Sequence, residues 1–361
     1  MKTEVKSNAY LSHCWYMVAW SRDVGSAPMP LMLLDEPIVV YRTTDGAVVA
    51  MEDRCPHKLA PLSLGQVEGA DLRCAYHGLK FAPDGRCVEV PGQDTIPGVM
   101  RVKSYSVVEA HSAVWIWPGA AEYADPALIP PFGGIDDPEW RMMAGQMDYE
   151  ANYTLINENL LDLSHVAFVH RNSFGAGEKR AADPKTNIAF APRRTEKLPR
   201  GLRFTRVVEN APTNPLLRQW IDPVSDVWSV VHYLAPGIFL LNADTYKAGS
   251  IARAGGQRPP DADYLHRSFS CQAVTPMTDR TSRYFYAMGR WAQSSASIEA
   301  MFELTQTAFL EDNVVLTAQQ RVMDISPQVR PKLLPSDKEG IEFSRIMDRL
   351  IRKEQVRTEG A

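Results

Sequence analysis

Two short stretches, CPH at residues 55–57 and CAYH at residues 74–77, carry the clearest structural signal in this chain. Each contains one cysteine and one histidine in the same order, and residues 58–73 separate them. Thiolates and imidazoles are strong ligands for transition metals, so the repeat indicates one metal centre held between two loops. Structural zinc usually takes C-x2–4-C and H-x3–5-H spacings, so a zinc site is the weaker interpretation.

A binuclear iron–sulfur cluster fits these mixed loops better. In such a cluster one iron takes both thiolates, Cys55 and Cys74, and the other takes both imidazoles, His57 and His77. Each loop then reaches both irons. Two neutral imidazoles in place of thiolates reduce the negative charge of the site and raise its reduction potential. The sequence therefore predicts a centre that carries one electron at a time.

The sequence around these loops is typical of short strands joined by turns. Residues 37–42 and 47–51 are β-branched and apolar, and the TDG turn at residues 44–46 predicts a hairpin between them. Residues 114–117 read VWIW, a buried strand ended by a Pro-Gly pair. We therefore expect an all-β first domain.

A second domain follows a connector over residues 120–138, which is rich in Ala, Pro, Gly and Asp. Two domains are common for a chain of 361 residues, so we place the first at 1–120 and the second at 121–361. The expected fold class is α+β, with an antiparallel sheet packed by long helices. The predicted strands lie near residues 143–150, 202–209, 226–235, 237–243, 265–274 and 281–290, the predicted helices near 151–168, 296–323 and 337–354, and the predicted loops or lids at 171–200 and 246–263.

The second constellation lies at the start of this domain, where Glu158, Asp162, His165 and His170 follow one another closely. Residues three or four apart share a helix face, which brings Asp162 beside both Glu158 and His165. His165 and His170 are five apart, roughly 140° round an ideal helix. Both can face one metal only if the helix ends or bulges between them, a break that is common at functional sites.

A third ligand has to come from elsewhere, and the helix predicted near 296–323 offers Asp312. This acid lies within the stripe formed by Ile298, Phe302, Thr305, Phe309 and Leu316, whereas Glu311 falls on the far side and is expected to be solvated. A buried acid is costly unless it is paired or metal-bound. Two histidines and one carboxylate form the facial triad of non-haem iron(II) sites, although Asp312 as a cap or ion-pair partner is an alternative.

Both constellations resemble a known family. CPHKLAPLSLGQVEG and CAYHGLKFAPDGRCVEVPGQ resemble the Rieske [2Fe–2S] domain of oxygenase subunits over residues 8–119, closest to the vanillate O-demethylase and dicamba monooxygenase type. Leu79 stands where ring-hydroxylating dioxygenases commonly carry Trp. The pattern E-x3-D-x2-H-x4-H and the segment FLEDNVVLTAQQ resemble the mononuclear-iron motifs of the same oxygenases. The resemblance implies a helix-grip, START-like second domain.

The resemblance also implies residue roles. Iron(II) would be bound by His165, His170 and Asp312. Asp162 would hydrogen-bond His165 and also a cluster-ligand histidine, His77, of a neighbouring subunit, which implies a homotrimer. Such a carboxylate gives the free N–H of a metal-bound histidine an acceptor and forms a short coupling route. Asn159 would line the iron site without ligating.

The expected function is that of an oxygenase component that receives electrons from NAD(P)H through a separate flavin or ferredoxin-type reductase, since no G-x-G-x-x-G fingerprint follows a strand. One atom of O2 would enter the substrate. The subfamily resemblance implies O-demethylation of a methoxylated aromatic acid such as vanillate, with formaldehyde released. Alternatives are N-demethylation, methyl hydroxylation or ring hydroxylation of another aromatic, and a Rieske electron carrier without oxygenase activity.

The substrate contacts are the least determined part of the sequence. Asn242, in the predicted strand GIFLLNAD, resembles a polar substrate contact of the dicamba-type enzymes, and a structural hydrogen bond is the alternative. The net charge of −4 argues against a nucleic-acid binder driven by positive charge. No apolar run is long enough to span a membrane and the first residues lack a secretory signal, so we expect no membrane partner. Five cysteines, an odd number in a long chain, do not suggest a disulfide scaffold, so we expect a reducing, cytoplasmic location.

Overall fold

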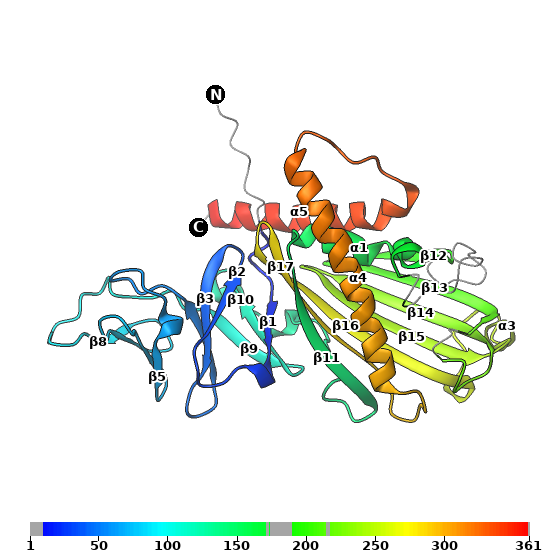
Figure 1. Ribbon diagram of the computed structural model, residues 1–361, viewed down its shortest axis with the longest axis horizontal. Helices are drawn as coiled ribbons and strands as arrows, with labels where there is room; N and C mark the ends of the chain where they lie inside the picture. Colours follow the sequence, from blue (N-terminus) through cyan, green and yellow to red (C-terminus); the bar gives the residue numbers. More distant parts are fainter. Residues whose placement is uncertain (1–9, 171–172, 174–189, 214–216, 360–361) are drawn as a thin grey trace. The chain divides into compact units, whose positions relative to one another are not determined.

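The chain forms two compact units in a computed structural model that describes residues 10–170, 173, 190–213 and 217–359. One unit comprises the residues up to Pro130 together with Thr275–Asp279 and the end of the chain from Lys353. The other comprises Pro131–Val274 and Arg280–Arg352. The first consists mainly of β-strands and the second combines an antiparallel sheet with helices, which confirms the expected α+β class (Figure 1).

The first unit contains three small sheets with the strand orders β1-β10-β9, β2-β3-β4 and β5-β6-β7-β8. The predicted hairpin is present, with Arg42 of β3 opposite Val48 of β4. The predicted VWIW strand is the centre of β10, which is buried along its whole length. The strands are β1 (Tyr16–Trp20), β2 (Met29–Leu33), β3 (Glu36–Arg42), β4 (Val48–Glu52), β5 (Gln66–Glu68), β6 (Asp71–Arg73), β7 (Lys80–Phe81), β8 (Cys87–Glu89), β9 (Ser106–Ala110) and β10 (Ala113–Trp117).

The second unit is built on a seven-stranded sheet with the order β11-β17-β16-β15-β14-β13-β12. Long β-branched and aromatic strands pair in register over most of their length, as in β14 against β15. The strands are β11 (Trp140–Tyr149), β12 (Arg193–Leu198), β13 (Gly201–Pro212), β14 (Val224–Leu234), β15 (Ile238–Lys247), β16 (Tyr264–Thr278) and β17 (Thr281–Trp291).

Three helices, α1, α4 and α5, cover one face of this sheet. On that face Tyr233 donates a hydrogen bond to Asn157 of α1 and packs edge-on against Phe343 of α5. On β17, Tyr286 packs against Phe302 and Phe309 of α4. We call the sheet face that carries Tyr233 the helix-covered face. The helices are α1 (Tyr153–Leu161), α2 (Val166–Val169), α3 (Ser250–Arg253), α4 (Ile298–Ile325) and α5 (Lys338–Glu359), and Figure 1 shows α4 crossing the strands of the sheet.

One predicted loop is partly wrong. Residues 193–198, inside the stretch expected to be a loop or lid, form the edge strand β12, paired with β13 from Arg193↔Arg206 to Leu198↔Gly201. The segment looks like a loop because an edge strand tolerates charged side chains along its length. Residues 171–172 and 174–189 of the predicted loop lie outside the described residues. The expected excursion at 246–263 begins with the last two residues of β15 and then contains α3 and a 3-10 turn at Asp261–Asp263.

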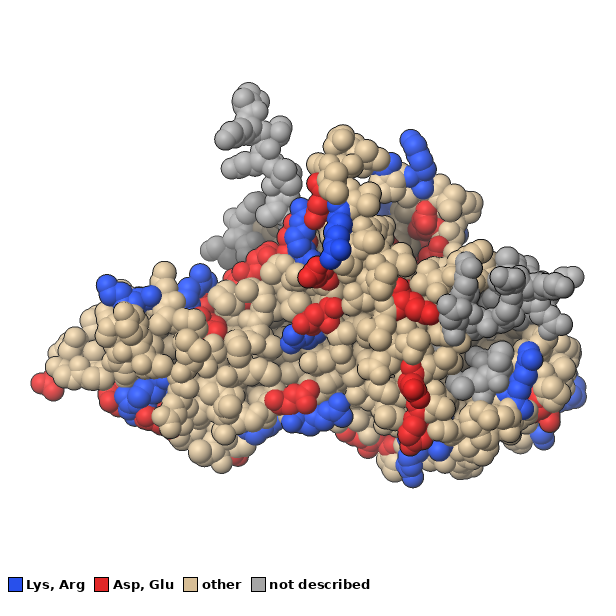
Figure 2. All heavy atoms as spheres, viewed as in Figure 1, with Lys and Arg blue, Asp and Glu red and all other residues tan. Residues whose placement is uncertain are grey.

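Charged side chains of both signs are interspersed on the face shown in Figure 2, with no large area of one sign. This agrees with the small net charge of −4. Among the described residues, no helix is both long enough and apolar enough to cross a membrane.

Candidate metal centres

The two Cys–His loops of the first unit have the same backbone geometry. In the first, the Cys55 amide donates to the carbonyl of Ala60 (2.9 Å) and the Leu59 amide donates back to the carbonyl of Cys55 (2.8 Å). In the second, Cys74 and Leu79 are joined in the same way (2.8 Å), and Gly78 donates to Cys74 (3.1 Å). The residue four positions after each cysteine is left-handed, Leu59 at φ 58° and Gly78 at φ 76°. Two equivalent loops therefore present equivalent ligands.

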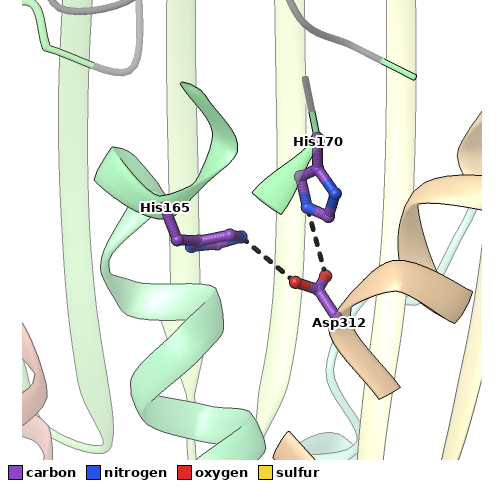
Figure 3. A group of neighbouring side chains, drawn as sticks. All are labelled: His165, His170 and Asp312. Atoms are coloured by element: carbon purple, nitrogen blue, oxygen red, sulfur yellow. Dashed lines mark ion pairs between the residues drawn. The ribbon is translucent and has the colours of Figure 1, made fainter. Parts of the chain in front are cut away.

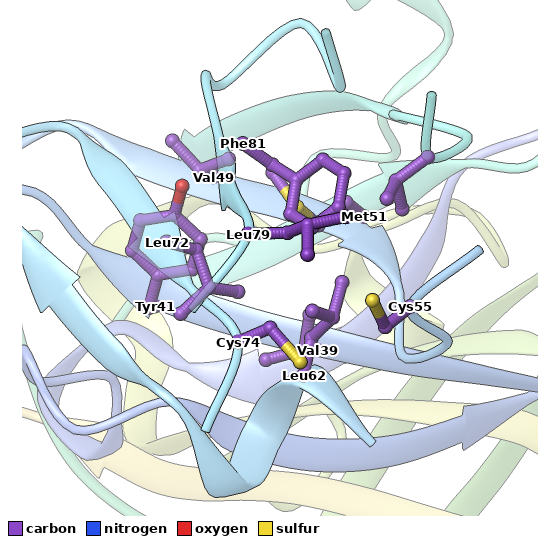
Figure 4. Packing of buried hydrophobic residues seen from close by; sticks show 11 residues of the cluster. Val39, Tyr41, Val49, Met51, Cys55, Leu62, Leu72, Cys74, Leu79 and Phe81 are labelled. Carbon is purple, nitrogen blue, oxygen red and sulfur yellow. The ribbon is translucent and has the colours of Figure 1, made fainter. Parts of the chain in front are cut away.

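The side chains of these loops converge. Cys55 and Cys74 are both buried in the hydrophobic cluster of Figure 4. Burial, and then the neighbouring Cys74, raises the pKa of the Cys55 thiol to about 11. The imidazole rings of His57 and His77 lie 4.5 Å apart, and both histidines are exposed. Two buried thiols and two adjacent exposed imidazoles are the donor set of a Rieske cluster, with the sulfur side inward and the histidine side outward.

The second candidate centre begins where α1 ends. Asn152 caps α1 by accepting from the Thr154 amide, and the helix stops at Leu161 because Asp162 is extended (φ −112°, ψ 92°). A 3-10 turn over Leu163–His165 follows, then α2, which ends just before His170. The main helix break therefore falls before His165, at Asp162, and the short helix α2 links His165 to His170, whose rings lie 5.1 Å apart.

Asp312 of α4 faces both imidazoles, as Figure 3 shows. Its Oδ1 lies 3.5 Å from Nε2 of His165, and its Oδ2 lies 3.3 Å from Nε2 of His170. One donor atom from each residue lies within 4.8 Å of the others. Helix α4 is anchored on both sides of Asp312, because Phe309 accepts from the Tyr149 hydroxyl and Asn313 donates to the carbonyl of Asp148. The structure thus brings together all three predicted iron ligands.

Both histidines are oriented for metal binding through Nε2. Nδ1 of His165 lies 2.6 Å from the main-chain oxygen of Asp162, and Nδ1 of His170 lies 3.0 Å from Glu311. An acceptor at Nδ1 holds the proton there and leaves the Nε2 lone pair free for a metal. Burial lowers the pKa of His165. Burial also opposes charge on His170, but Asp312 and Glu311 outweigh it and raise the pKa of His170.

Glu311 corrects one expectation. It is not a solvated residue on the far side of α4: its side chain is 23% exposed, and it also accepts from Ser173 (2.7 Å). Helical periodicity could not reveal this contact, because His170 and Ser173, which bond Glu311, belong to a segment distant from α4 in sequence. The only sequence signal that could have indicated the contact between Glu311 and His170 is the position of Glu311 directly before the predicted ligand Asp312.

Asp162 and Asn159 both lie at the centre. The Asn159 side chain donates to Oδ1 of Asp312 (3.2 Å), which fits a residue that lines the site. Asp162 departs from the expectation, because its main-chain oxygen, not its carboxylate, meets His165. The carboxylate instead accepts from the Ser164 amide (2.9 Å) and caps the 3-10 turn. Asp162 therefore shapes the backbone that carries His165.

Asn242 lies away from this centre. It is in register with Val230 and Phe269, and alternation along β15 places it on the face opposite Phe239, which is the cross-strand neighbour of Tyr233. On that opposite face Phe269 lies beside Trp140 of β11, with ring centroids 5.7 Å apart. The structure gives no support to the predicted substrate contact at Asn242.

Two residues that sequence reasoning missed lie on the helix-covered face. Arg206 and His266 are buried, and atoms of both side chains, Nε and Nη1 of Arg206 and Nε2 of His266, have no hydrogen-bond partner among the described residues. The signal for Arg206 was present in the sequence, because it occupies an apolar phase of β13, between Phe204 and Val208. Nothing in the sequence marks His266.

A two-loop Cys/His site and a His/His/Asp site in one chain define the class of Rieske non-haem iron oxygenases. The chain belongs to this family: residues 14–106 match the Rieske [2Fe-2S] domain and residues 149–353 match the vanillate O-demethylase oxygenase C-terminal domain. It is an oxygenase component of the kind found in aromatic monooxygenase systems, with a Rieske cluster and a mononuclear iron as its cofactors.

Relatives match almost end to end. The chain is 35% identical to the toluene-4-sulfonate monooxygenase system iron-sulfur subunit of Comamonas testosteroni, covering 96% of this chain and 98% of the relative. It is 32% identical to a vanillate O-demethylase oxygenase subunit of a Pseudomonas species, with 97% of each chain covered. The crystal structure of dicamba monooxygenase bound to dicamba is similar at TM-score 0.80 and 27% identity, covering 96% of this chain and 99% of that one.

Proposed function

We propose that this chain O-demethylates a methoxylated aromatic acid of the vanillate type and releases formaldehyde. The His165, His170 and Asp312 site carries the proposal, because a three-residue donor set leaves positions on an iron open for O2 beside a substrate. The similarity to a vanillate O-demethylase subunit and to dicamba monooxygenase supports this substrate type. Hydroxylation of the methoxy carbon gives a hemiacetal, which collapses to a phenol and formaldehyde.

The residues have distinct parts in this proposal. His165 and His170 would hold iron(II) through Nε2, and Asp312 through its carboxylate; bound iron supplies the activation of O2. The Asp162 carbonyl and Glu311 fix the two imidazoles, and Asn159 holds the Asp312 carboxylate in place. Each acceptor keeps a proton on Nδ1 and so preserves the ligand form of the ring.

Electrons would enter through the cluster held by the two loops. Cys55 and Cys74 would bind one iron, and His57 and His77 the other. The donor would be a separate flavin or ferredoxin-type reductase that uses NAD(P)H. All five cysteines are free thiols, which fits a reducing compartment such as the proposed cytoplasm.

We also propose a homotrimer in which the exposed histidine side of one cluster meets Asp162 of a neighbouring subunit. The support is local. His57 and His77 are exposed, and so are the apolar side chains beside them, Leu59 and Tyr76. Apolar side chains around an exposed redox centre are typical of a surface covered by a partner.

Hydroxylation of an aryl methyl group is the second candidate. It is favoured by the relatives at 35% and 34% identity, both iron-sulfur subunits (the second a putative one) of a toluene-4-sulfonate monooxygenase system. N-dealkylation has support from the chloroacetanilide N-alkylformylase oxygenase component at 29% identity. An electron carrier without oxygenase activity would not need the second centre.

Two measurements test the function. The first is formaldehyde release with a panel of methoxybenzoates, toluene-4-sulfonate and N-methyl aromatics, supplied with a heterologous reductase and NADH. Release from methoxybenzoates alone is expected; an alcohol product from toluene-4-sulfonate without formaldehyde from any methoxybenzoate contradicts O-demethylation. The second is iron content, since an oxygenase holds three irons per chain and a carrier of a [2Fe–2S] cluster holds two.

A further inference from the structure

Arg206, on the central part of β13, is a buried cation that the proposed iron chemistry does not use. Its side chain is 2% exposed. Its Nε and Nη1 atoms have no hydrogen-bond partner within the described part of the chain. The guanidinium lies over the Phe204 ring, 5.1 Å from its centroid, but a ring face leaves the N–H donors Nε and Nη1 unmet, which is costly for a buried cation.

The alternation of β13 shows which way Arg206 points. Leu202 and Phe204 precede it in the same phase, and both are buried. Leu202 is in register with Tyr233, so this phase projects from the helix-covered face. Arg206 therefore lies on the side of the sheet where α1 leads into the His165 turn.

The charges nearest to Arg206 are already engaged. Glu339, at the start of α5, forms an ion pair with Arg193 and accepts from Thr195. Asp162 caps the Ser164 amide. Burial, then the neighbouring Arg193, lowers the pKa of Arg206 to about 10, which still leaves it charged at neutral pH. Among the described residues, no carboxylate forms an ion pair or a hydrogen bond with this guanidinium.

The residues beside Arg206 on the same face are small. In register across the sheet, Arg206 is followed by Ser229 on β14, Ala243 on β15 and Ser268 on β16. Ala243 and Ser268 remain partly exposed although they lie on the helix-covered face. Arg206 and Ser229 are buried, whereas the end of the row at Ala243 and Ser268 remains partly open to solvent.

We propose that Arg206 binds the acid group of the aromatic substrate, a carboxylate or a sulfonate, with the ring over the row of Ser229 and Ala243. This inference rests on the proposed function, which supplies an aromatic acid as substrate. A guanidinium fork binds two oxygens of one oxyanion at once, which satisfies the unmet Nε and one terminal nitrogen together. The acid would then set the orientation of the ring, and with it which carbon faces the iron.

The test compares binding of acids and of a neutral analogue to the iron-loaded protein by titration calorimetry. The probes are vanillate, toluene-4-sulfonate and vanillyl alcohol. The variants are Arg206→Met and Arg206→Gln, which remove the charge, and Arg206→Lys, which keeps it without the fork. Arg203→Met is the matched control, because Arg203 lies on the same strand but on the opposite face, where it pairs with Glu196.

We expect Arg206→Met and Arg206→Gln to weaken binding of the preferred acid on the order of 100-fold, the loss typical of a charge-assisted bond. Vanillyl alcohol should bind wild type and variants alike, and Arg203→Met should match wild type. Arg206→Lys should recover part of the affinity. If the wild-type protein binds vanillate more tightly than toluene-4-sulfonate, the acid group is a carboxylate. The reverse preference identifies a sulfonate.

Three results overturn the proposal: unchanged acid affinity in Arg206→Met, equal losses for the acids and the alcohol, or failure of both neutral variants to fold. The last two show a structural guanidinium. The outcome is separable from O-demethylation. Formaldehyde from vanillyl alcohol with no Arg206-dependent acid binding keeps the activity and rejects the anion site. Arg206-dependent binding of toluene-4-sulfonate without any demethylation keeps the site and rejects the activity.

Discussion

Nδ1 of His170 lies 3.0 Å from the Glu311 carboxylate, while Nε2 of the same ring faces Asp312, the next residue along α4. Two consecutive acids of one helix therefore hold the two nitrogens of one imidazole. Helical geometry puts neighbouring residues about 100° apart, and this arc is wide enough for Glu311 and Asp312 to reach both nitrogens of the ring. Glu311 fixes the ring, and Asp312 shares the proposed metal with it.

Replacing Glu311 by Gln should weaken iron binding at the mononuclear site by about 10- to 100-fold, because the outer acceptor of a ligand histidine is lost. The measurement is mononuclear iron retained against a chelator, with the visible spectrum of the cluster unchanged. Glu303→Gln is the control, since Glu303 is an exposed acid of the same helix. Equal iron retention in both variants would reject the role of Glu311.

Asp312→Ala should abolish turnover and lower the iron content from three to two per chain, because one of three ligands is removed and the two clustered irons stay. The cluster's visible spectrum serves as the internal control. An active variant, or one that keeps three irons, would show that Asp312 is not a ligand.

Two substitutions at Asp162 should distinguish its role as a cap of the 3-10 turn from its proposed role in electron transfer. Asp162→Asn keeps a side-chain oxygen for the Ser164 amide, so its stability should equal wild type; Asp162→Ala should lose about 1 kcal/mol through the missing cap. Both should slow reduction of the mononuclear site, measured by single-turnover kinetics, if the carboxylate bridges two subunits. A wild-type rate in Asp162→Asn would argue against bridging.

The two cluster loops should respond in opposite ways to changes at their left-handed residues. Gly78→Ala should cost roughly 1–2 kcal/mol, because a Cβ is strained at φ 76° and would meet Pro91 at 3.0 Å. Leu59→Gly should be neutral or stabilising by up to about 1 kcal/mol, because it relieves the same strain at φ 58°. Thermal loss of the cluster's absorbance measures both. A more stable Gly78→Ala variant would contradict the shared loop geometry.

The sequence by itself determined the donor types and the elements that carry them. Cys55 and His57, like Cys74 and His77, are neighbours along the chain, so one short loop brings each pair together whatever the rest of the fold does. Asp312 could be chosen over Glu311 as a ligand because burial follows helical period, and Asp312 is indeed on the buried side of α4.

Only the tertiary structure decided which residues surround these donors. The contact between Glu311 and His170 joins segments distant in sequence, and no local pattern encodes it. The surroundings of Asn242 and Arg206 could not be predicted for a related reason. Alternation says that side chains on a strand point to two faces, but the pairing of strands and the placement of α1, α4 and α5 decide which face is covered. That choice turned Asn242 away from the centre and left Arg206 buried on the helix-covered face.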